Sequence, residues 1–328
     1  MTMESTVPST GAIDNTARYP LDPLTGAEIE TAAAVITDSE YATPTLKFVM
    51  IQLAEPDKTP ALTFEGAVEV PRRAFVSMYD GAAKLIYEAI VDLGARVIDS
   101  WKAVPGRFPS YLVEHMTGVE EVVRADPRWQ EAMRKRGVTD LHGYARPVEG
   151  LIVTFDLDAM KVIDIEDHGV VPLPPTAGNY AEKFMFDENN RPAFTQFRDD
   201  VKAIEITQPD GPSFSVDGWK VAWQKWSMRV GFNPREGITL HEVAYTDRGE
   251  TRPIIYRASL SEMVVPYGDT QPTHWNKNVF DMGEVGMGFS ANPLTLGCDC
   301  LGEIFYFDGT VNDSSGNAVT IPNAICMH

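Results

Sequence analysis

This chain contains the segments Val264-Val265-Pro266-Tyr267-Gly268-Asp269 and Val279-Phe280-Asp281-Met282-Gly283-Glu284. In the second segment, Asp281 stands between two large apolar residues, with glycine close by. A carboxylate that is poorly hydrated has a raised pKa, so it can act as a general base near neutral pH. The alternative for Asp281 is a turn aspartate that precedes Gly283.

Tyr267 is the second candidate for chemistry, because it lies between Pro266 and Gly268 at the end of an apolar run. A tyrosine in this place could donate a hydrogen bond to an oxygen atom of a cofactor. The alternative is a half-buried tyrosine at the end of a strand.

The residues around these segments predict the first strands of a large antiparallel β-sandwich, over residues 205–328. Aromatic-rich strand patterns begin at Phe214, and the runs Thr239–Tyr245 and Pro253–Ala258 flank a turn at 247–249. No long helical pattern follows residue 205. Three tryptophans in this region are expected to pack in the core or across strands rather than to form a ligand cage: Trp219, Trp223 and Trp226. A partial sandwich leaves unpaired edges and a half-covered apolar face, so the chain should either need another polypeptide or aggregate.

In the N-terminal part, the sequence predicts a flexible arm over residues 1–18 and a small α+β domain over residues 19–103. Thr25 and Glu28 form a capping-box pattern, and apolar residues of the following helix share one face. Four strand patterns then predict an antiparallel sheet: Leu46–Leu53, Arg73–Tyr79, Lys84–Val91 and Ala95–Trp101.

Residues 104–204 predict a second small α+β domain on the same plan, helix plus four-stranded antiparallel sheet. Helical patterns cover Ser110–Arg124 and Pro127–Arg136, and strand patterns cover Gly150–Asp156 and Lys161–Asp167. The fold class predicted for the whole chain is therefore α+β.

The composition is strongly acidic, with a formal net charge of -19 over 328 residues. Such a charge argues against nucleic acid and anionic membranes as partners. It reflects either a solvated acidic surface or a surface that attracts cationic substrates. No apolar run reaches the roughly 20 residues of a membrane span, and the residues Met1–Thr6 have no signal-peptide pattern. These features predict a cytoplasmic protein.

Local metal and nucleotide motifs are absent from the sequence. The six histidines contain no His-x-His or His-x-x-x-His pair, and there is no GxGxxG, Gly-x-Ser-x-Gly or CxxC pattern. The three cysteines are Cys298, Cys300 and Cys326. Cys298 and Cys300 are too close to be expected partners, so either one of them pairs with Cys326 or all three are free thiols. Spacing alone favours free thiols in a cytoplasmic protein.

Several segments, in the same order along the chain, together resemble one enzyme family. They are Tyr19-Pro20-Leu21-Asp22-Pro23-Leu24-Thr25, the run 206–214, Arg257-Ala258-Ser259-Leu260-Ser261-Glu262-Met263, the two segments quoted first, and Leu296-Gly297-Cys298-Asp299-Cys300-Leu301-Gly302. This pattern resembles the copper-dependent primary amine oxidases, which build the cofactor topaquinone from one of their own tyrosines. The resemblance runs from about residue 19 to residue 328, and it is greatest to bacterial phenethylamine, tyramine and histamine oxidases.

The resemblance implies a reaction and roles for the two candidate residues. Enzymes of this family convert a primary amine, dioxygen and water to an aldehyde, ammonia and hydrogen peroxide, with copper and topaquinone as cofactors. Asp281 matches the catalytic base that takes the α-proton of the substrate. Tyr267 matches the tyrosine that donates a hydrogen bond to the quinone oxygen.

The resemblance also implies a substrate channel and a disulfide. Val279 matches the substrate gate, where the family often has an aromatic residue, so valine puts a preference for aromatic amines in doubt. Tyr144 matches an aromatic residue that lines the channel. The family pattern pairs Cys300 with Cys326 and leaves Cys298 free.

Part of the family's catalytic machinery has no counterpart in these 328 residues. The Asn-Tyr-Asp/Glu precursor of topaquinone is absent, since Asn179-Tyr180-Ala181 lacks the acidic residue, and so is the copper-binding His-x-His. We therefore expect no metal site in this chain, and a partner chain that carries the copper ligands and topaquinone, in a dimer of such pairs. The alternatives are a non-catalytic truncated family member that acts in interaction or assembly, a decayed gene product, and an artificial or proteolytic fragment.

Overall fold

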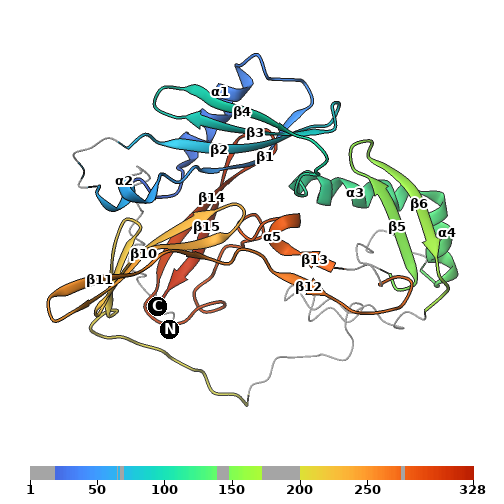
Figure 1. Ribbon diagram of the computed structural model, residues 1–328. Helices are drawn as coiled ribbons and strands as arrows, with labels where there is room; N and C mark the ends of the chain where they lie inside the picture. The colour runs from blue at the N-terminus through green and yellow to red at the C-terminus, as the bar shows by residue number, and fades with distance from the viewer. Residues whose placement is uncertain (1–18, 65, 67–69, 139–147, 172–199, 275–277) are drawn as a thin grey trace, which may run out of the picture. The chain divides into compact units, whose positions relative to one another are not determined.

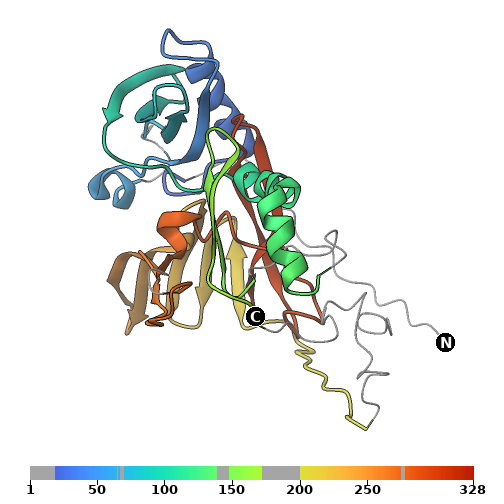
Figure 2. The same ribbon diagram turned by 90° about the vertical axis from the view of Figure 1, so that its right-hand side faces the viewer.

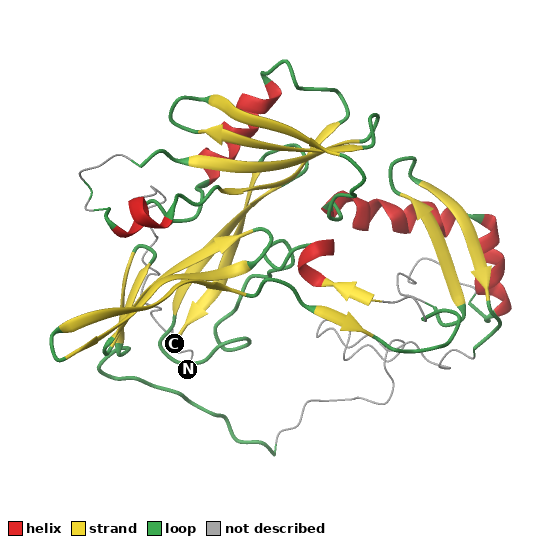
Figure 3. Ribbon diagram, in the orientation of Figure 1, coloured by secondary structure: helices red, strands yellow, loops and turns green. Residues whose placement is uncertain are grey.

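The computed structural model describes residues 19–64, 66, 70–138, 148–171, 200–274 and 278–328. These residues form two compact units. The described parts of 1–114, 206–266 and 278–328 make up the first unit, and those of 115–205 and 267–277 make up the second. Helices and antiparallel strands occur in both (Figure 3), which confirms the α+β class.

The first unit begins with helix α1 (Gly26–Thr37), which packs on a four-stranded sheet (Figures 1 and 2). The capping box is confirmed, because the Thr25 hydroxyl accepts a hydrogen bond from the Glu28 N–H and the Glu28 carboxylate accepts one from the Thr25 N–H. The sheet has the order β1-β2-β3-β4, with the bounds Leu46–Leu53, Arg73–Asp80, Leu85–Asp92 and Val97–Val104. The sequence prediction missed the short helix α2 (Lys58–Leu62) between the first two strands.

A hairpin from the end of the chain packs against this sheet and its helix. Strands β14 (Phe305–Asn312) and β15 (Ala318–Met327) pair antiparallel. Strand β1 lies at the edge of its sheet, so its outward backbone donors have no partner within the sheet. The Phe48 N–H donates to the Ser314 carbonyl oxygen (2.9 Å), and the Ile51 N–H donates to Asn312 Oδ1 (2.7 Å). The two ends of the described chain therefore share one core.

The sandwich strands form a five-stranded antiparallel sheet of order β11-β10-β9-β8-β7. In chain order, their bounds are Phe214–Asp217, Lys220–Trp223, Trp226–Asn233, Gly237–Asp247 and Glu250–Ser259. Trp219 stacks on the buried Phe307 with ring centroids 5.3 Å apart, and Trp226 packs edge-on against Tyr245. Trp223 lies opposite Trp226 across β8 and β9, although its side chain is exposed.

The second unit contains helices α3 (Val113–Ala125) and α4 (Pro127–Lys135) and the hairpin of β5 (Leu151–Asp156) and β6 (Lys161–Asp167). Trp129 and Met133 of α4 are buried against Val148. The buried Arg136 donates hydrogen bonds to the carbonyl oxygens of Ala132, Gly150 and Gly169 and to Asp167. The other two strands predicted for this sheet are not among the described residues.

Candidate functional site

Strand β13 (Asn278–Phe280) leads directly into helix α5 (Asp281–Glu284), and these two elements carry the candidate base. Strand β13 pairs antiparallel with β12 (Val264–Pro266), and this register places Val279 opposite Val265. Asp281 is the first residue of α5. The predicted gate, Val279, and the predicted base, Asp281, thus lie two residues apart where β13 meets α5.

Neither of the other two predicted site residues belongs to β13 or α5. Tyr267 follows β12 in the chain, belongs to the second unit, and has a side chain that is 58% exposed. Tyr144 lies outside the described residues. The roles expected for both residues stay predictions.

Hydrogen bonds hold the start of α5 in place. Met282 is buried, and its N–H donates to Glu262 Oε1 (3.1 Å). The same oxygen accepts the N–H of Met263 (3.0 Å), and Arg235 Nη2 lies 3.8 Å from the other carboxylate oxygen. Glu262, which lies just before β12, therefore ties the residue that follows Asp281 to the strand that pairs with β13.

The end of α5 is fixed by the segment before α3. The Tyr111 N–H donates to the Glu284 carbonyl oxygen (2.6 Å), and the Ser110 hydroxyl donates to the Gly283 carbonyl oxygen (2.9 Å). Carbonyl groups at the end of a helix have no partner within the helix, so these bonds stabilise a helix of only four residues.

The loop after α5 packs tightly on the turn between β9 and β10. The N–H groups of Met287 and Phe289 donate to the carbonyl oxygens of Arg235 and Pro234. A Cβ atom at Gly288 would collide with the Asn233 carbonyl oxygen, so only glycine allows this close approach. The β9–β10 turn thus supports the element that carries Asp281.

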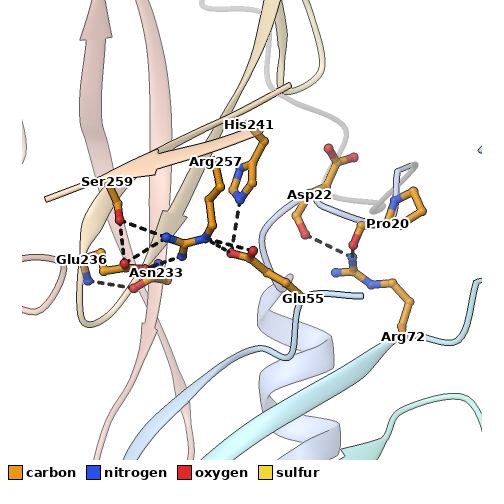
Figure 4. A network of polar contacts seen from close by, with 9 residues as sticks. All are labelled: Pro20, Asp22, Glu55, Arg72, Asn233, Glu236, His241, Arg257 and Ser259. Atoms are coloured by element: carbon orange, nitrogen blue, oxygen red, sulfur yellow. Dashed lines mark hydrogen bonds and ion pairs between the residues drawn. The ribbon is translucent and has the colours of Figure 1, made fainter. Parts of the chain in front are cut away.

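That turn belongs to a polar network of Asn233, Glu236, Arg257, Ser259, Glu55 and His241 (Figure 4). Arg257 Nη2 donates to Glu236 Oε2 (2.6 Å), and Arg257 Nη1 donates to Glu236 Oε1 (3.1 Å). Asn233 Nδ2 and Ser259 Oγ donate to the same carboxylate. Burial, the largest single influence, raises the pKa of Glu236, but these donors together lower its pKa to about 2.

On its other side, Arg257 binds a residue from the N-terminal part of the chain. Arg257 Nε lies 2.9 Å from both carboxylate oxygens of Glu55, and Nε2 of His241 lies 3.2 Å from Glu55 Oε1. Burial raises the pKa of Glu55, but the bonds from His241 and Arg257 outweigh it, so the pKa lies below its ordinary value. Arg257 therefore links Glu55, just after β1, to the β9–β10 turn.

A bulge in β10 directs two neighbouring side chains of that strand to residues from the N-terminal part of the chain. Glu242 has a positive φ of 51°, and the strand register shifts there. His241 contacts Glu55, while Glu242 Oε1 lies 2.7 Å from the Tyr19 hydroxyl. Neighbouring strand residues normally face opposite sides, so the bulge is what allows both contacts. Sequence reasoning missed both contacts, because no pattern in the sequence marks this bulge.

Two of the three cysteines lie together. Cys300 Sγ and Cys326 Sγ are 2.9 Å apart, whereas Cys298 is exposed. Burial raises the pKa of the Cys326 thiol to about 11, and the neighbouring Cys300 adds to this effect. Their proximity is consistent with the pairing that the family resemblance implies.

No copper site is found in the part of the chain that the structure describes. There, no group of three or more histidine, cysteine, aspartate or glutamate side chains is arranged to hold a metal ion. Three of the described histidines face carboxylates instead: His168 faces Glu166, His241 faces Glu55, and His274 faces both Asp269 and Glu149. The described residues therefore do not fit a copper-histidine centre. Separately, no described helix is both long and apolar enough to cross a membrane.

Comparison with known families gives two matches along the chain. Residues 19–104 match the copper amine oxidase N2 domain, and residues 215–328 match the copper amine oxidase enzyme domain. Similar proteins include the primary amine oxidase of Arthrobacter sp. strain P1, with 41% identity over 94% of this chain and 52% of that protein. The histamine oxidase of Arthrobacter globiformis is 34% identical over 98% of this chain and 51% of its own length.

Solved structures show the same likeness. A copper-containing benzylamine oxidase from Hansenula polymorpha superimposes with a TM-score of 0.76 and 25% identity, over 94% of this chain and 55% of that chain. This chain therefore spans about half the length of the relatives that it matches.

Proposed function

This chain belongs to the copper amine oxidase family, with an N2 domain and part of the enzyme domain, and we propose that it is one subunit of a split primary-amine oxidase. The complete enzyme converts a primary amine, dioxygen and water to an aldehyde, ammonia and hydrogen peroxide. Support comes from the collinear match to the family, which includes the β12, β13 and α5 elements. A second polypeptide supplies the remaining part of the sandwich, the copper ligands and topaquinone.

In this proposal, Asp281 is the catalytic base. Its backbone is fixed by the bonds that Met282 and Glu284 make, so a base at this position is held in one place relative to the sandwich. The base accepts the α-proton of the amine, and the cofactor of the partner chain supplies the oxidising chemistry. Tyr267 orients the quinone, and Val279 and Tyr144 line the substrate channel.

Exposed apolar side chains on the sandwich strands support a requirement for a second polypeptide. They lie on β10, β11 and β12: Ile238, Ile254, Ile255, Val264 and Val265. Strand β11 is also the last strand of its sheet as described, so one of its edges has no neighbour there. Exposed apolar side chains and an open strand edge are features that another chain can cover. The same proposal includes a dimer of such pairs, a cytoplasmic location, and domain boundaries near residues 104 and 205.

We expect this chain to form a stable complex with a polypeptide that carries the Asn-Tyr-Asp/Glu and His-x-His sequences of the family. Tagged chain should be purified from its native cells and analysed for copper, for quinone staining and for amine-dependent hydrogen peroxide. Copper and quinone should travel with the second polypeptide, and this chain alone should show neither. Quinone staining of this polypeptide, or failure of the two chains to associate when co-expressed, would contradict the proposal.

A second candidate function is an interaction or assembly protein that reuses the front domains of the family. The genes next to the gene for this chain distinguish the two functions. Only a split enzyme requires a neighbouring reading frame that encodes the other half of the enzyme. A decayed gene product would have neither such a frame nor a stable complex.

We predict a disulfide between Cys300 and Cys326, with Cys298 as the free thiol. The two sulfur atoms already lie 2.9 Å apart, so little movement is needed to join them. Peptide mapping of unreduced protein after alkylation should find one labelled cysteine and one cross-linked pair. Three alkylated cysteines would show that the pair stays reduced.

A further inference from the structure

One histidine of the second unit lies between two carboxylates. His274 Nδ1 is 2.8 Å from Asp269 Oδ2, and His274 Nε2 is 3.3 Å from Glu149 Oε2. The other oxygen of Glu149 accepts a hydrogen bond from the Thr273 hydroxyl (3.0 Å), and Thr273 is only 6% exposed. Two neighbouring residues of the loop after β12 therefore hold one carboxylate.

The same residues close the loop on itself. The Gln271 N–H donates to Asp269 Oδ1 (2.9 Å), and the His274 N–H donates to the Gln271 carbonyl oxygen (2.9 Å). His274 thus places one ring nitrogen against each carboxylate, Nδ1 against Asp269 and Nε2 against Glu149.

We propose that Asp269, His274 and Glu149 form a clamp that sets the position of Tyr267, an inference that rests on the proposed function. Only Gly268 separates Tyr267 from Asp269, and its φ of +66° lies in the left-handed region that glycine adopts readily. The direction of Tyr267 is therefore determined by one glycine turn and by the residue fixed to His274. His274 and Glu149 are positioning residues that act through Tyr267, while Tyr267 itself contacts the cofactor.

The clamp predicts a local effect when His274 is replaced. In His274→Ala, the backbone amides of Gln271 and of residue 274 should exchange with deuterium about 10-fold faster than in the wild-type chain. The reason is that Asp269 and Glu149 lose the side chain that both of them face. Glu149→Gln should also speed the exchange, because it removes the charge that faces the imidazole. His168→Ala is the matched control, because the His168 side chain pairs with Glu166 and the variant keeps the backbone bond from residue 168 to Gly150.

Exchange should be measured by mass spectrometry on the full chain in its complex, together with kcat and KM for amine oxidation. We expect a kcat about 10-fold lower in His274→Ala with little change in KM, and partial recovery in His274→Asn and His274→Gln, which each keep one donor. Unchanged exchange in both His274→Ala and Glu149→Gln would overturn the clamp. Faster exchange with normal kcat would overturn the positioning of Tyr267. A wild-type complex without amine oxidation would refute the proposed function, and the exchange data would still decide the clamp.

Discussion

Replacing Asp281 by asparagine is expected to lower kcat of the assembled enzyme by about 10²- to 10⁴-fold, the usual contribution of a general base. Asparagine has nearly the same shape as aspartate but cannot accept the α-proton of the amine. Amine-dependent formation of hydrogen peroxide, measured on the complex with the second polypeptide, reports the loss. Because α5 is held by backbone bonds of Met282, Gly283 and Glu284, the variant should fold and assemble as the wild-type chain does.

A matched control for this variant is Asp217→Asn, since Asp217 is an exposed aspartate of β7 in the same unit. It should leave kcat unchanged. An amine deuterated at the α-carbon provides a second check. Asp281→Asn should oxidise this amine more slowly than the undeuterated amine, because removal of the α-hydrogen should limit its residual rate. If Asp281→Asn keeps more than about a tenth of the wild-type kcat, Asp281 is not the base, since a base contributes at least about 10²-fold.

Local rules predicted the regular elements well. The capping box of Thr25 and Glu28 marked the start of α1, and a strand-like run predicted β1 with its observed bounds, Leu46–Leu53. Such signals depend on residues close together in the sequence, so they can be seen without a structure. The short helix α2 has no comparable signal, because five residues are too few to show a helical period.

The contacts that support the candidate site join residues far apart in the sequence. Glu55 and Arg257 are separated by 202 residues, and the Ile51–Asn312 bond joins positions 261 residues apart. Bulges occur in β1 and β10 near these contacts, and no turn residue in the sequence marks them. The apolar neighbours of Asp281 made it a candidate base, but only the resemblance to the family favoured this role over that of an ordinary turn aspartate.

Replacing Arg257 by methionine is expected to destabilise the first unit by about 2–4 kcal/mol, close to the cost of removing one partner of a buried ion pair. The change leaves Glu55 and Glu236 facing each other across a partly buried site without their shared cation. The midpoint of urea unfolding should fall accordingly. Arg252→Gln on the same strand is the control, because Arg252 is exposed, and it should change this midpoint little.

The pH dependence of this effect has a definite sign. Folding lowers the pKa of Glu236 to about 2, so the stabilisation from this carboxylate is complete above its unfolded value of about 4.3 and is lost as the pH falls toward 2. The difference in unfolding midpoint between wild-type and Arg257→Met chains should therefore shrink between about pH 4.3 and 2. An equal difference across that range would show that Arg257 stabilises the unit by packing alone, without its charge. Since Glu236 and Asn233 hold the turn on which the Asp281 loop rests, Arg257→Met should also lower kcat at neutral pH.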